Sequence, residues 1–440
     1  MKHTVTELKL RNGARGLLIH IPDASVMSFE CNFRAGEYLV SPEKWETPHL
    51  MEHMLLGANE RFPKSRVFQA EIEKNGAYSN ASTSVYEISY EAECADFEWE
   101  RILELMLLAI TKPLFLADEF DAEVGNVREE LTARSNNHFR HLSLELRERY
   151  GFMAKTDEER LKLMENVTVS DVREHYERTH TSRNLRFIVA GNLTPKRAQI
   201  VEAMLASVEL PLGTERIELP DEYPAPQDGP VYVHNKTVKN LYFYIDSFMV
   251  RRMSEPETDA LNLVNTMLTE TLYSKILGTA RERGLVYGMS SGFGQTKLSS
   301  NWWFGAQVSQ KNANPLFDIV IDELNNVFRG EIAAEDIEAA QAYALGRFQR
   351  SAQTVAGVAA GYSGRYFFEE QIDDYYQVPR RIKAITKSQI VDIANALFAD
   401  GIWGVGILSN CEKPFARELH DRLSPLWPAK TEKLKKLKKH

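Results

Sequence analysis

The sequence predicts an α+β protein built from two similar halves, and three observations support this fold class. Segments with strand and helix patterns occur in the same order before and after the middle of the chain. A proline-rich stretch without sustained apolar periodicity, residues 210–230, separates the two halves. The chain has 440 residues, enough for two or more domains. We therefore expect an N-terminal domain at residues 1–212, a linker at 213–230 and a C-terminal domain at 231–429.

Each half is expected to open with two strands and a helix. In the first half, apolar runs predict strands at residues 17–21 and 26–33, and a helical pattern follows at 48–56. The second half repeats this order. Later segments add amphipathic helices to the first half and a strand near the end of each half. The second half is expected to open with strands at 231–234 and 241–248 and a helix at 257–269. The later helices are expected at 97–107 and 196–205, and the later strands at 185–191 and 401–408.

The first predicted helix carries a metal-binding pattern. His49, Glu52 and His53 fall on one helical face, because successive residues of a helix are about 100° apart. The two imidazoles are four residues apart, so they can bind one cation together. Glu52 lies beside the second histidine, where it can act on a water at the cation. This order, H-x-x-E-H, is the inverzincin signature.

A third ligand is expected further along the chain. Catalytic zinc usually takes three protein ligands and leaves a fourth position for water. Residues 120–131 have a helical pattern in which Glu123 and Glu130, seven positions apart, share one face. Glu130 follows His53 by 77 positions. Both carboxylates are therefore candidates for the same site.

This combination resembles the pitrilysin/insulinase family of zinc peptidases, family M16. In that family a glutamate at a similar distance from the histidine pair is the third ligand, and another glutamate precedes it by seven positions. Glu130 matches the ligand and Glu123 the second acid. Segment 52–57 departs from the family pattern by a Leu in place of Phe and by one residue fewer before Gly57. Further segments that resemble the family lie at 10–13, 33–36 and 80–83.

The resemblance implies a zinc centre with one Zn²⁺ per chain, bound by His49, His53 and Glu130. Zinc would polarise the scissile carbonyl and lower the pKa of water to roughly 7. Glu52 would accept the proton of this water and deliver it to the leaving amine. Glu123 would orient His49 or His53 through the second ring nitrogen.

The resemblance also implies the architecture of each half. Each is expected to be a mostly antiparallel sheet backed by helices, an α/β sandwich, and the two halves are expected to face each other around a chamber. Our own alignment of the halves has an offset of 213 residues, at which the second copy lacks the metal motif. At this offset His49, Glu52 and His53 correspond to Asn262, Asn265 and Thr266.

Two further segments are expected to bind substrate. Residues 76–90 alternate with period two after a glycine turn, and an unpaired strand edge there can accept an extended peptide. By resemblance, Asn80 and Ala81 line this edge. Segment 281–287 resembles a family segment whose Arg and Tyr reach the substrate, and a tyrosine O–H near the metal can stabilise the oxyanion. Because many relatives have one more residue before the glycine, Arg281 or Arg283 can match the arginine; we favour Arg281 with Tyr287.

Composition places the protein among ordinary globular chains, with 43% hydrophobic and 26% charged residues. No apolar run of 18 residues occurs, so we expect no membrane span, and the N-terminus lacks the apolar segment of a signal peptide. Three cysteines far apart in the sequence argue against a disulfide framework. We therefore expect a cytoplasmic protein.

The charge distribution bears on partners. Net charge is −9, and the tail at residues 430–440 contains six lysines and one glutamate, so the rest of the chain carries −14. An acidic body disfavours nucleic acid and attracts cationic peptides. The tail has the composition of an anchor for anionic membranes or RNA, but we interpret it as a solvated helix end. We expect peptide substrates, no nucleic acid and no membrane.

The sequence thus predicts a zinc endopeptidase that hydrolyses unfolded peptides inside a chamber. Family members of this length usually pair two chains to close the chamber, so we expect a homodimer or a heterodimer with a second M16-type chain. Two alternatives stay open: a non-catalytic or partner-dependent subunit of such a heterodimer, and a processing peptidase dedicated to one peptide. Other histidines are weaker candidates for a metal site: His138, His141, His175 and His180.

Overall fold

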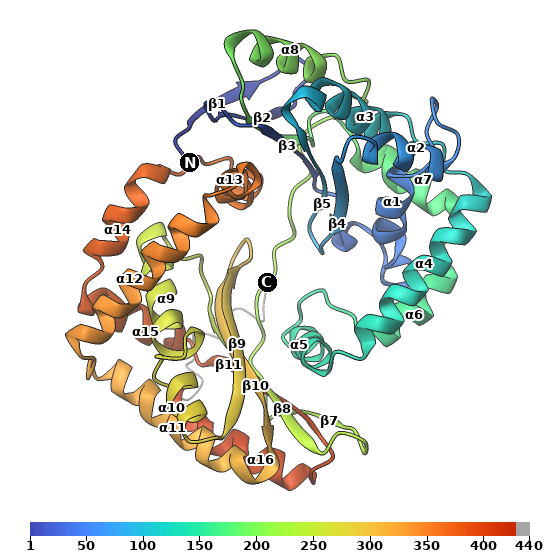
Figure 1. Ribbon diagram of the computed structural model, residues 1–440. Coiled ribbons are helices and arrows are strands. Elements are labelled where there is room, and N and C mark those ends of the chain that lie inside the picture. Colours follow the sequence, from blue (N-terminus) through green and yellow to red (C-terminus); the bar gives the residue numbers. More distant parts are fainter. Residues whose placement is uncertain (428–440) are drawn as a thin grey trace. The chain divides into compact units, whose positions relative to one another are not determined.

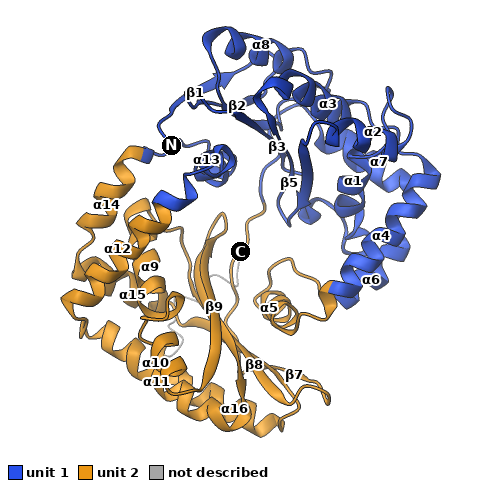
Figure 2. Ribbon diagram, viewed as in Figure 1, with its two compact units in different colours: residues 1–133, 157–219, 349–375 blue, residues 134–156, 220–348, 376–440 orange. Residues whose placement is uncertain are grey.

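The computed structural model describes residues 1–427 as two compact units (Figures 1 and 2). Unit 1 contains residues 1–133, 157–219 and 349–375, and unit 2 contains the other described residues. The lysine-rich tail at 430–440 lies outside the described residues, so its predicted helix end stays a prediction.

Unit 1 contains a six-stranded sheet in the order β1-β2-β6-β3-β5-β4. The pair β2–β6 is parallel and the other four pairs are antiparallel. The alternation along β3 divides its side chains: Met27, Phe29, Cys31 and Phe33 face the main core of the unit. The strands are β1 (Thr4–Lys9), β2 (Arg15–His20), β3 (Val26–Phe33), β4 (Tyr78–Thr83), β5 (Ile88–Ala95) and β6 (Arg186–Gly191).

Unit 2 repeats this sheet without the first strand. Its order is β7-β11-β8-β10-β9, again with one parallel pair, β7–β11, and antiparallel pairs elsewhere. Strand for strand, β7, β11, β8, β10 and β9 correspond to β2, β6, β3, β5 and β4. The strands are β7 (Val231–His234), β8 (Asn240–Met249), β9 (Val286–Gln295), β10 (Ser300–Ser309) and β11 (Ile402–Ser409).

Helices back each sheet and follow the same order in both units, as Figure 1 shows. The apolar stripes of these helices and the inward side of each sheet form the two large cores. The helices of unit 1 include α1 (Thr47–Leu55), α2 (Ser65–Glu73), α3 (Trp99–Thr111), α4 (Ala117–Ser135), α6 (Asp157–Leu163), α7 (Val169–Thr179) and α8 (Pro195–Ala206). Those of unit 2 include α9 (Glu255–Asn265), α10 (Leu277–Glu282), α11 (Gln310–Phe328), α12 (Ala334–Ser351), α14 (Val378–Ala384), α15 (Lys387–Ala399) and α16 (Lys413–Leu423).

One helix from each half of the sequence packs on the sheet of the other half, as the colours of Figure 2 show. Helix α13 (Val355–Glu369) covers the outer side of the unit 1 sheet, where Val358 and Tyr362 contact the apolar side chains of β2 and β6. Helix α5 (His138–Arg149) covers the outer side of the unit 2 sheet, where Leu142 and Leu146 pack. The predicted domain limits at 1–212, 213–230 and 231–429 follow the sequence repeat and are not coextensive with these units.

Two glycines of β11 allow α5 and the residue after it to pack closely against the strand. A Cβ at Gly404 would lie 2.4 Å from the Tyr150 hydroxyl, and one at Gly406 would lie 2.8 Å from Leu142 Cδ1. Real side chains do not approach so closely. The pattern Gly-x-Gly in the predicted strand 401–408 therefore marks the place where a helix lies directly against the strand.

The fold class is confirmed: both units are mostly antiparallel sheets backed by helices. The predicted strands and helices occur at their expected positions, with two differences. The segment at 76–90, expected to be one edge strand, contains the edge strand β4, a turn and the start of β5. The helix expected at 257–269 is α9, which continues into a π-helix at Thr266–Glu270. Within residues 1–427, no helix has the length and apolar character needed to cross a membrane. All three cysteines are buried and unpaired by disulfides.

Candidate metal centre

Helix α1 brings the predicted histidine pair together in unit 1. Pro48 stands in the first turn, where a missing backbone N–H costs nothing, and the helix packs against β4 and α7. His49 is buried and His53 is partly exposed. Their rings lie at 78° with centroids 5.0 Å apart. Both imidazoles thus project from the same face of one helix, as the spacing predicts.

Helix α4 supplies the third predicted ligand. Glu130 Oε2 lies 3.3 Å from His49 Nε2 and 3.5 Å from His53 Nε2. One ligand atom from each residue lies within 4.8 Å of the others, and this is the one such cluster among the described residues. Two imidazole nitrogens and a carboxylate oxygen are the donor set of a catalytic zinc site. The residues present therefore fit the metal that the motif predicts.

The other ring nitrogens of the histidines are held by carboxylates. Glu123 Oε2 lies 3.0 Å from His53 Nδ1, and Asn126 donates to the same oxygen at 3.1 Å. Glu46 Oε2 lies 3.0 Å from His49 Nδ1. Such partners fix the ring orientation and leave Nε2, which faces Glu130, as the ligand atom. The sequence left open which histidine Glu123 orients, and in the structure it is His53.

Glu46 is a site residue that the sequence reasoning missed. It immediately precedes α1 and lies three residues before His49. An acid about one helical turn before a ligand is a sequence pattern that could have identified it as a partner of the histidine. Its carboxylate is fully buried and accepts from Arg160 Nε at 2.5 Å and Nη2 at 2.9 Å. Burial raises the pKa of Glu46, but His49 and Arg160 outweigh this and lower it overall. The carboxylate is therefore charged.

The carboxylates also act on the protonation of the histidines. Burial lowers the pKa of His53, but Glu123 and Glu130 outweigh burial and raise it to about 9. In His49, burial again opposes the shift, and Glu130 and Glu46 raise the pKa. A metal ion must displace these protons, so metal affinity is expected to fall as the pH is lowered.

The predicted base lies on the same helix with a fixed partner. Thr83 Oγ1 donates to Glu52 Oε2 at 2.6 Å. Thr83 ends β4, the last strand of the sheet, and Ala81 of the same strand is buried against the core. Asn80 points to the other side, is exposed and donates to Glu91 at 3.4 Å. The motif 80–83 thus links the strand edge to the base.

Arg281 and Tyr287, the other predicted substrate residues, lie in unit 2 near the start of β9. Arg281 donates to the Tyr287 carbonyl oxygen, and its guanidinium carbon lies 4.7 Å from the centre of the tyrosine ring. The Tyr287 side chain is 86% exposed. Arg281 is therefore paired with Tyr287 within the unit, and contact with a substrate stays a prediction for Arg281, Arg283 and Tyr287.

The weaker histidine candidates do not join the metal cluster. His138 contacts the Tyr242 ring, and His141 lies 3.7 Å from Glu145. His180 is buried beside Tyr90, whose hydroxyl lies 3.0 Å from Nε2. His175 is buried and donates from Nε2 to the Ala35 carbonyl at 2.8 Å, while Nδ1 accepts from Arg178 at 2.9 Å. These partners identify structural roles.

We expect His175 to make the protein less stable in acid. Burial lowers its pKa to about 4, whereas an unfolded histidine titrates near 6.5. Below pH 6.5 the unfolded chain gains a proton that the folded chain excludes, so His175 costs about 2–3 kcal/mol of stability by pH 4.5. Urea unfolding between pH 7 and 4.5 should show a shallower loss for His175→Gln than for the wild type. Parallel pH curves would contradict this assignment.

Two family models match the chain. The model described as "Insulinase (Peptidase family M16)" matches residues 42–161, the range that holds His49, Glu52, His53, Glu123 and Glu130. The model described as "Peptidase M16 inactive domain" matches residues 166–343. The division agrees with the metal motif, which is present in the first half and replaced in the second.

Curated relatives match part of the chain. Insulin-degrading enzyme-like 1, peroxisomal, from Arabidopsis thaliana is 29% identical over 126 residues, 28% of this chain and 12% of that protein. The probable zinc protease PqqL of Escherichia coli K12 is 25% identical over 203 residues, 43% of this chain and 22% of that protein. The matched regions thus span less than a quarter of the length of these relatives.

Solved structures share the whole fold. A protease from Helicobacter pylori superposes with a TM-score of 0.81 at 19% identity, covering 93% of this chain and 100% of that one. A peptidase M16 inactive domain from Pseudomonas fluorescens also reaches 0.81, at 16% identity, with 93% and 98% coverage. These identities establish the fold alone. With both family models in their expected order and the same fold throughout, the chain belongs to peptidase family M16.

Proposed function

We propose that this chain is a zinc-dependent endopeptidase that cleaves unfolded peptides. The observation that carries the proposal is the convergence of His49, His53 and Glu130, with both remaining imidazole nitrogens held by carboxylates. When bound, zinc supplies Lewis-acid polarisation of the scissile carbonyl and lowers the pKa of water. Helix α1 provides two of the ligands and the proton-transfer group, and helix α4 provides the third ligand.

Glu52 is the proposed proton-transfer group. It takes a proton from the attacking water and delivers it to the nitrogen of the leaving amine, so one carboxylate serves both steps. The hydrogen bond from Thr83 to one carboxylate oxygen fixes the side chain and leaves the second oxygen for the water. A base held in place needs no reorganisation when the substrate arrives.

The edge of β4 is the proposed peptide-binding strand. Its position at the end of the sheet allows an extended peptide to pair with its backbone. Because main-chain hydrogen bonds do not depend on side-chain identity, this mode suits broad specificity for unfolded peptides. Asn80 and Ala81 belong to this strand, and Thr83 joins it to the proposed base.

Arg281 and Tyr287 are the proposed substrate contacts of unit 2. The exposed tyrosine presents its hydroxyl to solvent, as a donor to a substrate carbonyl requires. We further propose that two chains, identical or of two M16 types, close a chamber around the site. Native mass spectrometry tests this assembly: a dimer is expected, and a fully active monomer would contradict it.

The non-catalytic subunit is the less favoured alternative. The "inactive domain" match covers residues 166–343, whereas all three predicted ligands lie in the range matched by the insulinase model. A chain that had drifted into a structural role would be free to lose these residues, as the second half has done.

Cleavage of a quenched fluorescent peptide pool tests the proposal. The wild type is expected to cleave flexible peptides, to lose activity with a chelator and to regain it with zinc. A tightly folded protein of similar composition serves as the control substrate and should stay intact. Activity that is unaffected by chelation would contradict the metal mechanism, and bound zinc without any cleavage would favour the alternative.

A further inference from the structure

Unit 2 has counterparts of the two helices that carry the candidate metal centre of unit 1, but with different side chains at the ligand positions. Helix α12 follows the same strands and helices in unit 2 that α4 follows in unit 1. Glu130 lies thirteen residues after the first residue of α4, and Arg347 lies thirteen residues after the first residue of α12. In helix α9, the alignment at an offset of 213 places Asn262 at the position of His49. A basic residue thus takes the place of the ligating glutamate.

The contacts support this correspondence independently. In unit 1, Glu130 contacts His49. In unit 2, Arg347 Nη2 donates to Asn262 Oδ1 at 2.6 Å, so the same two positions meet. The Arg347 guanidinium also forms an ion pair with Glu270, the last residue of the π-helix. At this position of unit 2 the positive charge is therefore supplied by an arginine side chain, and not by a bound cation.

Glu270 connects the Arg347 guanidinium to the residue that corresponds to the second histidine. Its Oε1 pairs with Arg347, and its Oε2 accepts from Thr266 Oγ1 at 2.9 Å. Thr266 corresponds to His53. The network therefore connects the counterparts of all three ligands, with the guanidinium between α9 and α12.

We propose that the guanidinium of Arg347 occupies the place in unit 2 that the zinc ion of the proposed function would take in unit 1. It joins the two helices by charge and hydrogen bonds, as a metal would by coordination. The site is a converted metal site, and it regains a metal when its three ligand positions are restored.

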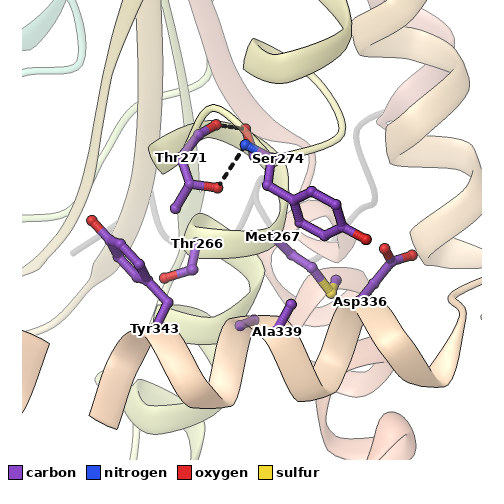
Figure 3. A pocket seen from close by; sticks show the side chains of 9 residues that line it. Thr266, Met267, Thr271, Ser274, Asp336, Ala339 and Tyr343 are labelled. Carbon is purple, nitrogen blue, oxygen red and sulfur yellow. Dashed lines mark hydrogen bonds between the residues drawn. The ribbon is translucent and has the colours of Figure 1, made fainter. Parts of the chain in front are cut away.

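The cavity beside Thr266 agrees with the conversion. Figure 3 shows Thr266, Met267, Ala339 and Tyr343 around a cavity of about 250 Å³. Ala340 also lines it and lies seven residues before Arg347, as Glu123 lies seven before Glu130. Threonine and alanine, which line this cavity, stand where unit 1 has a histidine and its carboxylate partner.

The residue at the position of the proposed base forms hydrogen bonds inside unit 2. Asn265, at the position of Glu52, accepts from Trp302 Nε1 at 2.9 Å and from Thr269 Oγ1 at 3.2 Å. It is buried and uncharged. A restored metal in unit 2 is therefore expected to bind without adding peptidase activity.

Zinc content tests the proposal in a full-length chain whose own site is removed by His53→Ala and Glu130→Ala. Adding Asn262→His, Thr266→His and Arg347→Glu should raise bound zinc from near zero to about one per chain after dialysis, measured by atomic emission. Arg347→Glu alone should add none. Ala340→Glu should tighten binding by about tenfold or more by holding the new imidazole. A folded triple variant without zinc would overturn the proposal.

A double-mutant cycle keeps the proposal testable if the triple variant does not fold. Arg347→Met should lower the urea midpoint, and the loss should be smaller when Glu270→Gln is already present, because the two side chains act as one network. Arg350→Met, an exposed arginine on the same helix, is the matched control and should leave the midpoint unchanged. Additive effects of Arg347→Met and Glu270→Gln would overturn the role of the guanidinium.

Discussion

Glu52→Gln is expected to lower kcat for peptide cleavage by about 10²–10⁴-fold while the protein keeps its zinc. Glutamine preserves the shape of the side chain and the hydrogen bond with Thr83, but it cannot take a proton from water. Glu52 is not among the three ligand residues, so metal content should not change. Initial rates on one peptide and zinc analysis of the same preparation measure both effects.

The neighbouring hydroxyl provides the matched control. Thr83→Val removes the 2.6 Å hydrogen bond but keeps the carboxylate that accepts the proton, so a smaller loss, about tenfold or less, is expected. Wild-type rates in Glu52→Gln would rule out Glu52 as the base. Loss of zinc together with activity would mean that Glu52 acts on the metal site itself.

Glu46→Ala is expected to lower the free energy of unfolding by about 3–5 kcal/mol, because it leaves the Arg160 charge buried without its main partner. The Glu46 carboxylate is completely buried, and the Arg160 side chain is 9% exposed. The same change removes the carboxylate that holds His49 Nδ1, so zinc affinity should also fall about 10–100-fold. Urea unfolding of zinc-free protein measures the stability, and zinc titration with a competing chelator measures the affinity.

A surface pair serves as the control for this prediction. Arg61 and Glu104 form an ion pair at 2.6 Å with both side chains 51% exposed, so Glu104→Ala should change stability by about 1 kcal/mol or less. Equal effects of Glu46→Ala and Glu104→Ala would contradict the structural role of the buried pair. An unchanged zinc affinity in Glu46→Ala would contradict its role in holding His49.

The metal ligands could be predicted from the sequence because their geometry is largely local. His49, Glu52 and His53 share a helical turn, and Glu123 and Glu130 share a face of a second helix. The fold of each half and the position of β4 came from the family resemblance, and the sheet order bears both out. Glu46 was within reach of the same spacing argument, since it lies one turn before His49.

Other features could not be predicted because they depend on distant contacts. Arg160 reaches Glu46 across 114 positions, and no local pattern links them. Helices α5 and α13 were not among the predicted elements, and each covers a sheet whose strands are distant in the sequence. The counterpart of Glu130 was hidden because the offset between the halves grows from 213 at the histidine motif to 217 at α4. Arg347 is identified by its position in α12 and by its contact with Asn262.

The most direct test of the central claim is the cleavage rate of chelated protein as zinc is returned stepwise. The ligand set predicts a linear rise that ends at one zinc per chain, because His49, His53 and Glu130 form a single site. A rate that is already maximal without zinc, or that ends its rise at a different stoichiometry, would contradict a single zinc centre as the source of the activity.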